Sequence, residues 1–321
     1  NIGISFLIKR RISYVVSGTF IIIGLSSLFI NGLNQGVDFV GGRSYVVRFE
    51  QPVSQEKIQS NLIKVLGNAE VKTFGSDNQL KITTNYKVDT DSSDIDDEIN
   101  NILYADLIEF MPENIAYEDF VVNGDENKQA GIMSSIKVGP TIADDIKKNS
   151  FYAVFGSLII VFLYILLRFK NWQFSLGAVS AVFHDVLVVL GIFSLTYSFM
   201  PFNMEINQAF IAAVLTVIGY SLNDTVVVFD RIREYRNINT SWELPRVVDS
   251  ALNSTLSRTL NTSFTTLVVL ISIFVFGGES IRGFMFALIV GVLIGTYSSV
   301  FVATPVTVSY THLTLPTTSA V

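Results

Sequence analysis

Long runs of apolar residues, separated by short charged or polar segments, recur along most of the chain. Each of six runs reaches at least about 17 residues, the length that an α-helix needs to cross the ~30 Å hydrocarbon layer of a membrane. They occupy residues 12–30, 151–167, 174–199, 206–229, 260–276 and 283–306. The pattern therefore predicts six transmembrane helices.

The segment between the first two runs, residues 33–150, has a different pattern. Alternating apolar and polar positions predict strands, and amphipathic spacing predicts helices. The predicted strands are 43–50, 70–74, 79–86 and 131–138, and the predicted helices are 54–66, with Ser54 as N-cap, and 94–110. The order βαββαβ predicts a small α+β domain with a ferredoxin-like fold. The expected fold class is an α-helical polytopic membrane protein with one such domain outside the membrane.

These patterns divide the chain into four regions. They are 1–32 (N-terminus and first transmembrane helix), 33–150 (the α+β domain), 151–308 (the other five transmembrane helices) and 309–321. We expect a cytoplasmic loop at 230–257, in which 241–257 forms a short helix lying in the membrane interface. The threonine-rich segment 309–321 lacks Lys and Arg, and we expect an artefactual or disordered tail there.

Composition agrees with a membrane protein, since 50% of the 321 residues are hydrophobic and 16% are charged. The charge is unevenly placed: residues 33–150 hold 20 Asp and Glu against 11 Lys and Arg. We interpret this acidic excess as a solvated surface. The chain has no cysteine, and two histidines, His184 and His312, are too few for a metal site. We therefore expect no metal, no other cofactor and no catalytic residue.

The Lys and Arg residues of the short loops indicate the orientation, because such residues accumulate on the cytoplasmic side. With a cytoplasmic N-terminus, the inside loops hold Arg168, Lys170, Arg231, Arg233, Arg236 and Arg246. The short outside loops then hold a single base, Arg282. This places residues 33–150 in a bacterial periplasm or its equivalent.

One ionisable residue lies in the fourth predicted span, where a carboxylate costs roughly 2.5–3.5 kcal/mol on insertion scales and usually serves a function. This residue is Asp224, preceded by Asn223, and we expect it to take up and release protons. Arg258 at the start of the fifth span can lie at a similar depth and favour its ionised form. A static ion pair, or an arginine that extends to the interface, is the alternative.

A polar stripe follows Arg258 along the fifth span. Ser254, Arg258, Asn261, Thr262, Thr265 and Ser272 share one face at 100° per residue. An apolar helix with one polar stripe is expected to lie against a polar interior or a wetted path. Asn261 and Thr262 are therefore candidate supporting residues.

The third span contributes a second titratable pair, His184 and Asp185, near the middle of the membrane. The pair could extend a proton path. Asp185 could equally be a hydrogen-bonding strut between helices, with His184 a satisfied interior residue. The sixth span repeats small residues at Ala287, Gly291, Gly295 and Ser299, which predicts a close-packing ridge.

Five stretches together resemble the SecF family of protein-export membrane proteins, part of the resistance-nodulation-division superfamily. The match covers residues 1 to about 308. The stretches are GVDFVGG at 36–42, VGP at 138–140 with Asp144 and Asp145, FHDV at 183–186, the run 219–231 that contains Asn223 and Asp224, and SRTLNTS at 257–263. The run 219–231 is the most specific of the five.

The resemblance implies a subunit that uses the proton-motive force to promote protein translocation across the bacterial cytoplasmic membrane. By motif position, Asp224 and Arg258 match family residues implicated in proton conduction, and we include Asn223 and Asp185 in the predicted proton relay. The expected partners are SecD, the SecYEG translocon and unfolded secretory proteins, with no nucleic acid. Because the chain opens at Asn1, we also consider the second half of a fused SecD–SecF polypeptide.

Three other functions are alternatives. A small-molecule exporter of the same superfamily is one, although such proteins tend to carry larger, duplicated outer domains. An intramembrane aspartyl protease is the second, because Asp185 and Asp224 are two membrane carboxylates. Its GxGD motif is missing, since Asp224 follows Ser221-Leu222-Asn223. A purely structural scaffold, the third, is disfavoured by the polar stripe of the fifth span.

Overall fold

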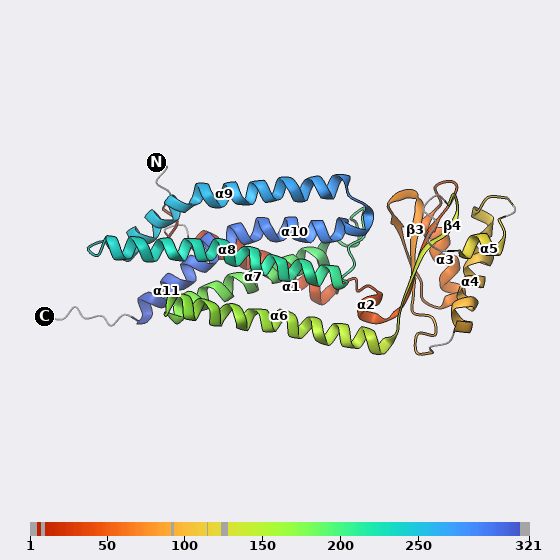
Figure 1. Ribbon diagram of the computed structural model, residues 1–321, viewed down its shortest axis with the longest axis horizontal. Helices are drawn as coiled ribbons and strands as arrows, with labels where there is room; N and C mark the ends of the chain where they lie inside the picture. The colour runs from red at the N-terminus through yellow and green to blue at the C-terminus, as the bar shows by residue number, and fades with distance from the viewer. Residues whose placement is uncertain (1–4, 8–9, 91–92, 114, 123–127, 315–321) are drawn as a thin grey trace.

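The protein has two parts: a bundle of long helices and, beyond one end of it, a small sheet with helices on its far side (Figure 1). The computed structural model describes residues 5–7, 10–90, 93–113, 115–122 and 128–314. The long helices are α1 (Arg10–Ile30), α6 (Pro140–Phe169), α7 (Trp172–Thr196), α8 (Gln208–Ile238), α9 (Leu244–Phe276) and α10 (Glu279–Ser298). A π-helical turn, η2 (Ser299–Ala303), joins α10 to α11 (Thr304–Thr314).

The prediction of six membrane-length helices is confirmed. Among the described residues, six helices are long and apolar enough to cross a membrane, and each contains most of a predicted span. Helix α6 begins at Pro140, well before its apolar run. A proline is favourable in the first turn of a helix, because the N–H that it lacks would have no partner there. The polar first turns of α6 therefore project beyond the apolar section toward the sheet.

The predicted interfacial helix at 241–257 and loop at 230–257 are wrong in detail. Helix α8 continues to Ile238, and α9 begins at Leu244 and runs unbroken to Phe276. No Gly or Pro lies between residues 246 and 276 to stop it. Its apolar residues Val247, Val248 and Leu252 are buried in the bundle core instead of in the membrane interface.

The predicted tail at 309–321 is helical in its first part, because α11 extends to Thr314. Residues 315–321 lie outside the described residues. A disordered tail is therefore wrong for residues 309–314.

The small part is built on one antiparallel sheet in the order β2-β3-β1-β4. Its strands are β1 (Gly42–Arg48), β2 (Glu70–Phe74), β3 (Ser76–Thr84) and β4 (Gly131–Val138). Its helices are α2 (Val37–Val40), α3 (Gln55–Leu66), α4 (Ser93–Leu107) with the 3₁₀ turn η1 (Ile108–Phe110), and α5 (Tyr117–Val121). All six predicted elements are present, and Ser54 accepts from the backbone N–H of Lys57 as the predicted N-cap.

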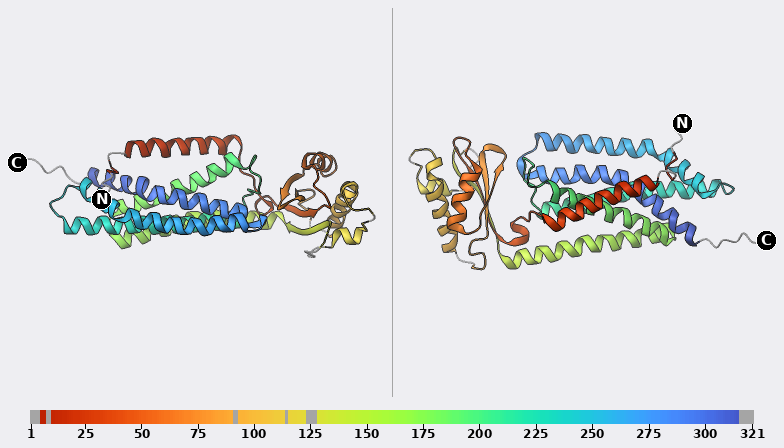
Figure 2. Two further views of the ribbon diagram at one scale, coloured as in Figure 1. Left: turned by 90° about the horizontal axis from the view of Figure 1, so that it is seen from above. Right: turned by 180° about the vertical axis from the view of Figure 1, so that it is seen from behind.

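The sheet has one apolar face and one more polar face. Helices α3 and α4 pack on the apolar face, where Val47, Ile58, Leu80 and Ile99 form part of a buried core. The other face is turned toward the end of the bundle (Figures 1 and 2). The sheet therefore stands between its own helices and the outer ends of the membrane helices.

Gly41 and Gly42 form the sharp turn from α2 into β1. Both have positive φ, 73° and 129°, a region that favours glycine. A Cβ on Gly42 would lie 2.5 Å from the carbonyl oxygen of Thr84 on the paired strand β3. The glycine pair therefore fixes the point at which the chain enters the sheet.

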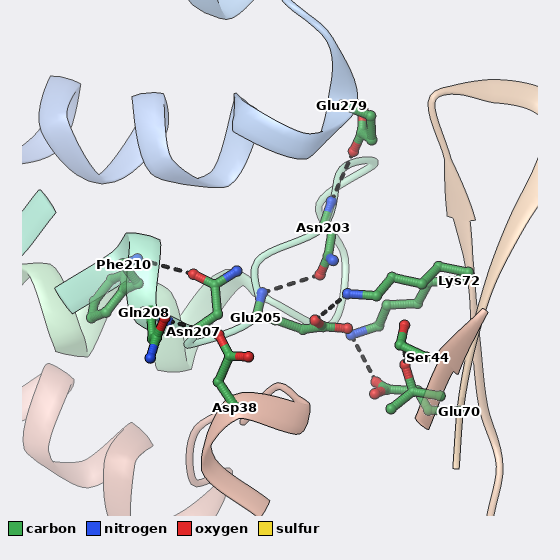
Figure 3. A network of polar contacts seen from close by, with 12 residues as sticks. Asp38, Ser44, Glu70, Lys72, Asn203, Glu205, Asn207, Gln208, Phe210 and Glu279 are labelled. Carbon is green, nitrogen blue, oxygen red and sulfur yellow. Dashed lines mark hydrogen bonds and ion pairs between the residues drawn. The ribbon is translucent and has the colours of Figure 1, made fainter. Parts of the chain in front are cut away.

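Backbone and side-chain contacts join the sheet domain to the bundle through the α7–α8 loop (Figure 3). Gly36 donates to the carbonyl of Ile206 at 2.9 Å, and Ile206 donates to the carbonyl of Asn34 at 2.7 Å. Lys81 of β3 forms an ion pair with Glu205, and both side chains are largely buried. Asp38 accepts from the backbone N–H of Gln208 at 3.0 Å. Lys81 and Glu205 also line a cavity of about 260 Å³ between the two parts.

Close helix packing in the bundle depends on glycines at the crossing points. A Cβ on Gly291 of α10 would lie 2.0 Å from a methyl carbon of Val217 on α8, and one on Gly295 would lie 3.0 Å from Ser221. Gly24 of α1 and Gly191 of α7 approach equally closely. The predicted ridge on the sixth span is thus confirmed as the surface on which α8 packs.

We expect Gly291→Val to lower the stability of the bundle by about 1–3 kcal/mol, because the added atoms collide with Val217. The matched control is Gly156→Val on α6, where a Cβ meets nothing within 4 Å. Thermal unfolding of the purified protein in detergent measures both. Equal unfolding temperatures for the two variants would contradict this packing.

We also expect Asp96→Asn to destabilise the sheet domain. Asp96 binds Arg43, whose side chain is 3% exposed, and Lys137. Partial burial raises the pKa of Asp96, but the hydrogen bonds from Arg43 and Lys137 outweigh it and hold this pKa below its usual value. Losing a hydrogen bond to a charged group costs about 1.5–3 kcal/mol, and the partial exposure of Asp96 places the loss at the low end.

The sign of the pH dependence follows from that lowered pKa. The ionised carboxylate contributes stability above the unfolded-state pKa of about 3.9, and this contribution is lost as the pH falls through the lower, folded-state pKa. The unfolding temperature should fall between about pH 7 and about pH 3, and this fall should be smaller for Asp96→Asn than for wild type. Glu98→Gln is the comparison, because it removes a more exposed ion pair with Lys87. The hydrogen bond from Lys87 also holds the pKa of Glu98 below its usual value, so this variant should show the same change to a smaller extent. An identical drop in wild type and Asp96→Asn would exclude this contribution.

Candidate functional site

Asp185 of α7 is fully buried in the middle of the bundle. One carboxylate oxygen, Oδ2, accepts hydrogen bonds from Ser221 of α8 at 2.6 Å and from Ser298 of α10 at 2.7 Å. The other, Oδ1, lies 3.0 Å from Nδ1 of His184. The carboxylate therefore ties three helices together, which matches the strut alternative without excluding a part in a proton path.

His184 lies beside this carboxylate and is also buried. Its Nδ1 contacts Asp185, whereas its Nε2 has no hydrogen-bond partner among the described residues. The ring of Tyr297 on α10 lies 6.2 Å away, centroid to centroid. Among the described residues, His184 thus makes one polar contact, through Nδ1, and its ring lies beside the ring of Tyr297.

Asp224 lies on the same helix as Ser221, three residues further from the sheet domain. At a rise of 1.5 Å per residue, this places it about 4.5 Å beyond the level of Asp185. Asp224 is buried, and its Oδ2 has no hydrogen-bond partner in the described part of the chain. Asp185 is satisfied by donors, but Asp224 carries a carboxylate oxygen that is buried and unpaired.

Arg258 of α9 interacts electrostatically with Asp224. Within the described residues, no hydrogen bond or ion pair shorter than 4 Å joins the two side chains. Arg258 instead lines an open groove of about 350 Å³ with Asp230, Arg231 and Glu234 of α8. Asp224 and Arg258 thus lie close enough to interact electrostatically, as predicted. The guanidinium of Arg258 extends toward the end of the bundle opposite the sheet.

The polar stripe of the fifth span faces outward from the described bundle. Of the two expected settings, a polar interior is therefore not provided by this chain, and a wetted path stays a prediction. Asn261 and Arg258 are exposed, and Thr262 is half-buried and donates to the carbonyl of Arg258 at 3.0 Å. Other residues of α9, Thr255, Thr259 and Ser263, occupy the buried face against the bundle. Asn223 of α8 is also exposed and does not contact Asp185.

Two site residues, Ser221 and Ser298, were missed in the sequence. Each is a small polar residue on a buried helix face, and each donates to Asp185. The available signal was the three-residue spacing between Ser221 and Asp224, which puts both on one side of α8. Ser298 gives no such signal, because its role depends on how α10 packs on α7.

Metal binding has no support in the described residues, where no three His, Asp or Glu side chains cluster closely enough to hold an ion. The expectation that the protein works without a metal or other cofactor remains a prediction.

A bundle of six membrane-length helices with buried carboxylates, and one α+β domain inserted between its first two helices, defines a polytopic membrane protein with an ionisable core. Residues 120–313 match the family described as protein export membrane protein SecD/SecF, C-terminal. Residues 26–53, around Gly41 and Gly42, match the SecD/SecF GG motif.

The curated relatives agree with these matches. The chain is 44% identical over 309 residues to the protein translocase subunit SecF of Rhodothermus marinus, covering 96% of this chain and 93% of that protein. It is 36% identical to the SecF subunit of Thermodesulfovibrio yellowstonii, covering 95% and 93%. The chain belongs to the SecF family of protein translocase subunits.

A solved structure shares the fold. The crystal structure of SecDF from Thermus thermophilus, described as a translocon-associated membrane protein, superposes with a TM-score of 0.79 at 28% identity. The match covers 96% of this chain and 39% of that one, so the chain spans less than half of the SecDF polypeptide. SecDF in a super-membrane-facing form is also similar, with a TM-score of 0.64.

We expect the two buried aspartates to respond differently to substitution. Asp185→Leu leaves the hydroxyl of Ser221 without its carboxylate, at a cost of about 1–3 kcal/mol, whereas the hydroxyl of Ser298 can still donate to the carbonyl of Gly295. Asp224→Asn removes a charge that has no hydrogen-bond partner on Oδ2, so the bundle should unfold at or above the wild-type temperature.

Thermal unfolding of both variants in detergent checks this difference, with Asp185→Asn as the conservative control that keeps one acceptor oxygen. If Asp224→Asn is less stable than Asp185→Leu, then the view that Asp185 stabilises the bundle and Asp224 does not is wrong.

Proposed function

We propose that this chain is the SecF-type subunit of an accessory complex of the Sec translocon, and that it uses the proton-motive force to promote protein translocation across the cytoplasmic membrane. Membership of the SecF family supports the translocation role. The observation that supports proton coupling is Asp224, a buried carboxylate with an unpaired oxygen and Arg258 in electrostatic range.

The physical basis is a charge that can be removed. Protonation of Asp224 neutralises a buried anion and weakens its attraction to Arg258, so that α8 and α9 can repack. Moving one charge through about 100 mV supplies about 2.3 kcal/mol, enough to shift such an equilibrium by roughly 50-fold. The open groove at Arg258 offers water a route to that end of the pair.

Asp185 takes a second role in this proposal. It contacts Ser221, which lies one turn from Asp224 on α8, and Ser298 on α10. A shift of α8 that follows protonation of Asp224 therefore changes the hydrogen bonds of Asp185. In this way Asp185 and His184 belong to the proton-coupled network, while Asn223, Asn261 and Thr262 face outward from it.

The outward-facing residues indicate a membrane partner, and we propose SecD. An exposed Arg258 on a lipid-facing surface is costly, as are exposed polar residues such as Asn223 and Asn261 beside it. A second bundle packed on this side covers them and completes the polar interior. The SecDF polypeptide, of which this chain matches 39%, supports such an arrangement. The SecYEG translocon and unfolded secretory proteins are the further partners of this proposal.

We place the protein in the bacterial inner membrane with a cytoplasmic N-terminus and the sheet domain in the periplasm. The bases Arg168, Lys170, Arg233 and Arg246 lie near the end of α6, the end of α8 and the start of α9. These helix ends are away from the sheet (Figure 1), in agreement with the positive-inside rule. For the sheet domain, residues 33–150, we propose a ferredoxin-like classification, supported by the strand order β2-β3-β1-β4.

The alternative functions have less support. For an aspartyl protease, two carboxylates must share one site, yet Asp185 is occupied by Ser221, Ser298 and His184 and makes no hydrogen bond with Asp224 among the described residues. For a small-molecule exporter, no relative reported above carries that description, since each is a SecF subunit or SecDF.

Protein export into inverted membrane vesicles, measured with and without a proton gradient, tests the proposal. Vesicles contain the full chain with its SecD partner, as wild type, Asp224→Asn or Glu243→Gln. The last variant is the control, because Glu243 is an exposed acid at the start of α9 whose side chain makes no capping hydrogen bond. We expect Asp224→Asn to lose the gradient-dependent part of export and Glu243→Gln to keep it. Equal gradient dependence in wild type and Asp224→Asn would sink the proton-coupling proposal.

A further inference from the structure

A second cavity lies at the end of the bundle away from the sheet, where α7, α8, α9 and α11 meet. Its volume is about 370 Å³, within the ~300–1,000 Å³ range of small-ligand sites. Arg233, Arg236, Asn171 and Asn237 supply its polar groups. The half-buried Phe174 and Leu244 supply an apolar wall, backed by the buried Ile232, Val248 and Val308. The cavity therefore combines hydrogen-bond donors with a hydrophobic surface.

The charge around this cavity is positive. Arg168 and Arg233 share one carboxylate, Asp230, at 2.9 Å and 3.1 Å. Arg236 is exposed and has no ion-pair or hydrogen-bond partner among the described residues. Of the described residues, two arginines and no acidic residue line the cavity, and the nearby Glu243 offsets only part of the positive charge. Guanidinium groups bind phosphate oxygens through paired hydrogen bonds.

The cavity also lies at the depth of a membrane surface. Helix α7 begins with Trp172, directly after the lining residue Asn171, and Trp242 precedes the lining residue Leu244 by two positions. These are the two tryptophans of the chain, and tryptophan is enriched where headgroups meet hydrocarbon. Basic pockets between helices at this level suit the headgroups of anionic lipids.

We propose that this cavity binds one anionic phospholipid, with its phosphate on Arg233 and Arg236 and the first part of an acyl chain against Phe174 and Leu244. A free phosphate would use the guanidiniums alone and leave the apolar wall unfilled. The site is separate from Asp224 and independent of the proton proposal. The leaflet alone depends on the proposed orientation, which makes it the cytoplasmic one.

Native mass spectrometry of the full chain in detergent tests this site. Delipidated protein is titrated with phosphatidylglycerol or with phosphatidylcholine of the same acyl chains, and inorganic phosphate is added as a competitor. We expect wild type to bind phosphatidylglycerol at least about fivefold more tightly than phosphatidylcholine, and Arg236→Gln to lose most of this preference. Inorganic phosphate should not displace the lipid.

Two further variants make the test specific. Arg246→Gln is the charge-matched control, because Arg246 stacks on Trp242 at 4.3 Å and does not line the cavity. Asn237→Trp fills the rim of the cavity and keeps every charge, so it should weaken lipid binding even though the arginines remain. Thermal unfolding in detergent shows which variants are folded.

Several results would overturn the proposal. Equal losses in Arg236→Gln and Arg246→Gln would show diffuse surface attraction, and unchanged binding in Asn237→Trp would place the lipid elsewhere. Equal affinity of wild type for the two lipids, or displacement by inorganic phosphate, would exclude a specific lipid site.

Discussion

A carboxylate that is buried away from water needs hydrogen-bond donors, and the fully buried carboxylate of this bundle is Asp185. Its oxygens are reached from three directions, by Ser221 on α8, Ser298 on α10 and His184 on its own helix. These donors reach it because α8 and α10 approach closely at Gly291 and Gly295. Hydrogen bonding and glycine packing therefore reinforce each other, and the relative positions of α7, α8 and α10 follow from both.

The same requirement shapes the contact between the two parts of the molecule. Glu205 in the α7–α8 loop is buried, and Lys81 from the sheet meets its charge. Glu279 at the start of α10 accepts from the backbone of Asn203 and pairs with Arg282. The loop that connects α7 and α8 thus contacts both the sheet and α10. The loop is therefore the part of the chain through which the sheet domain and the end of α10 are connected (Figure 3).

Much of the fold was predictable because its signals are local. Apolar runs gave six helices, and the strands at 70–74 and 131–138 match β2 and β4 residue for residue. The continuity of residues 241–257 with the fifth span was not predictable, because a separate interfacial helix and a continuous α9 fit the same apolar spacing. Tertiary packing of Val247 and Val248 on the bundle decided between them.

The candidate site was predictable in its charged members alone. Asp185, Asp224 and Arg258 stand out since charges inside apolar runs are rare. The side of α9 that faces the bundle was not predictable, because polar and small residues occur on two adjacent faces of this helix. In the structure, Thr255, Thr259 and Ser263 lie on the buried face. The serines that bind Asp185 depend on contacts between distant helices, and the spacing of Ser298 along α10 does not reveal them.

Where the chain leaves and re-enters the bundle, the two crossings are fastened to each other. Gly42 at the start of β1 pairs with Val138 at the end of β4, and Gly139 alone separates that strand from α6. The connection to α6 is a single residue, whereas residues 31–41, which include α2, link α1 to β1. If the ion pair of Lys81 and Glu205 opens, the hydrogen bonds of Asn34, Gly36 and Asp38 with the α7–α8 loop still hold the domain. A rotation of the sheet about the start of α6 therefore has to break these bonds as well.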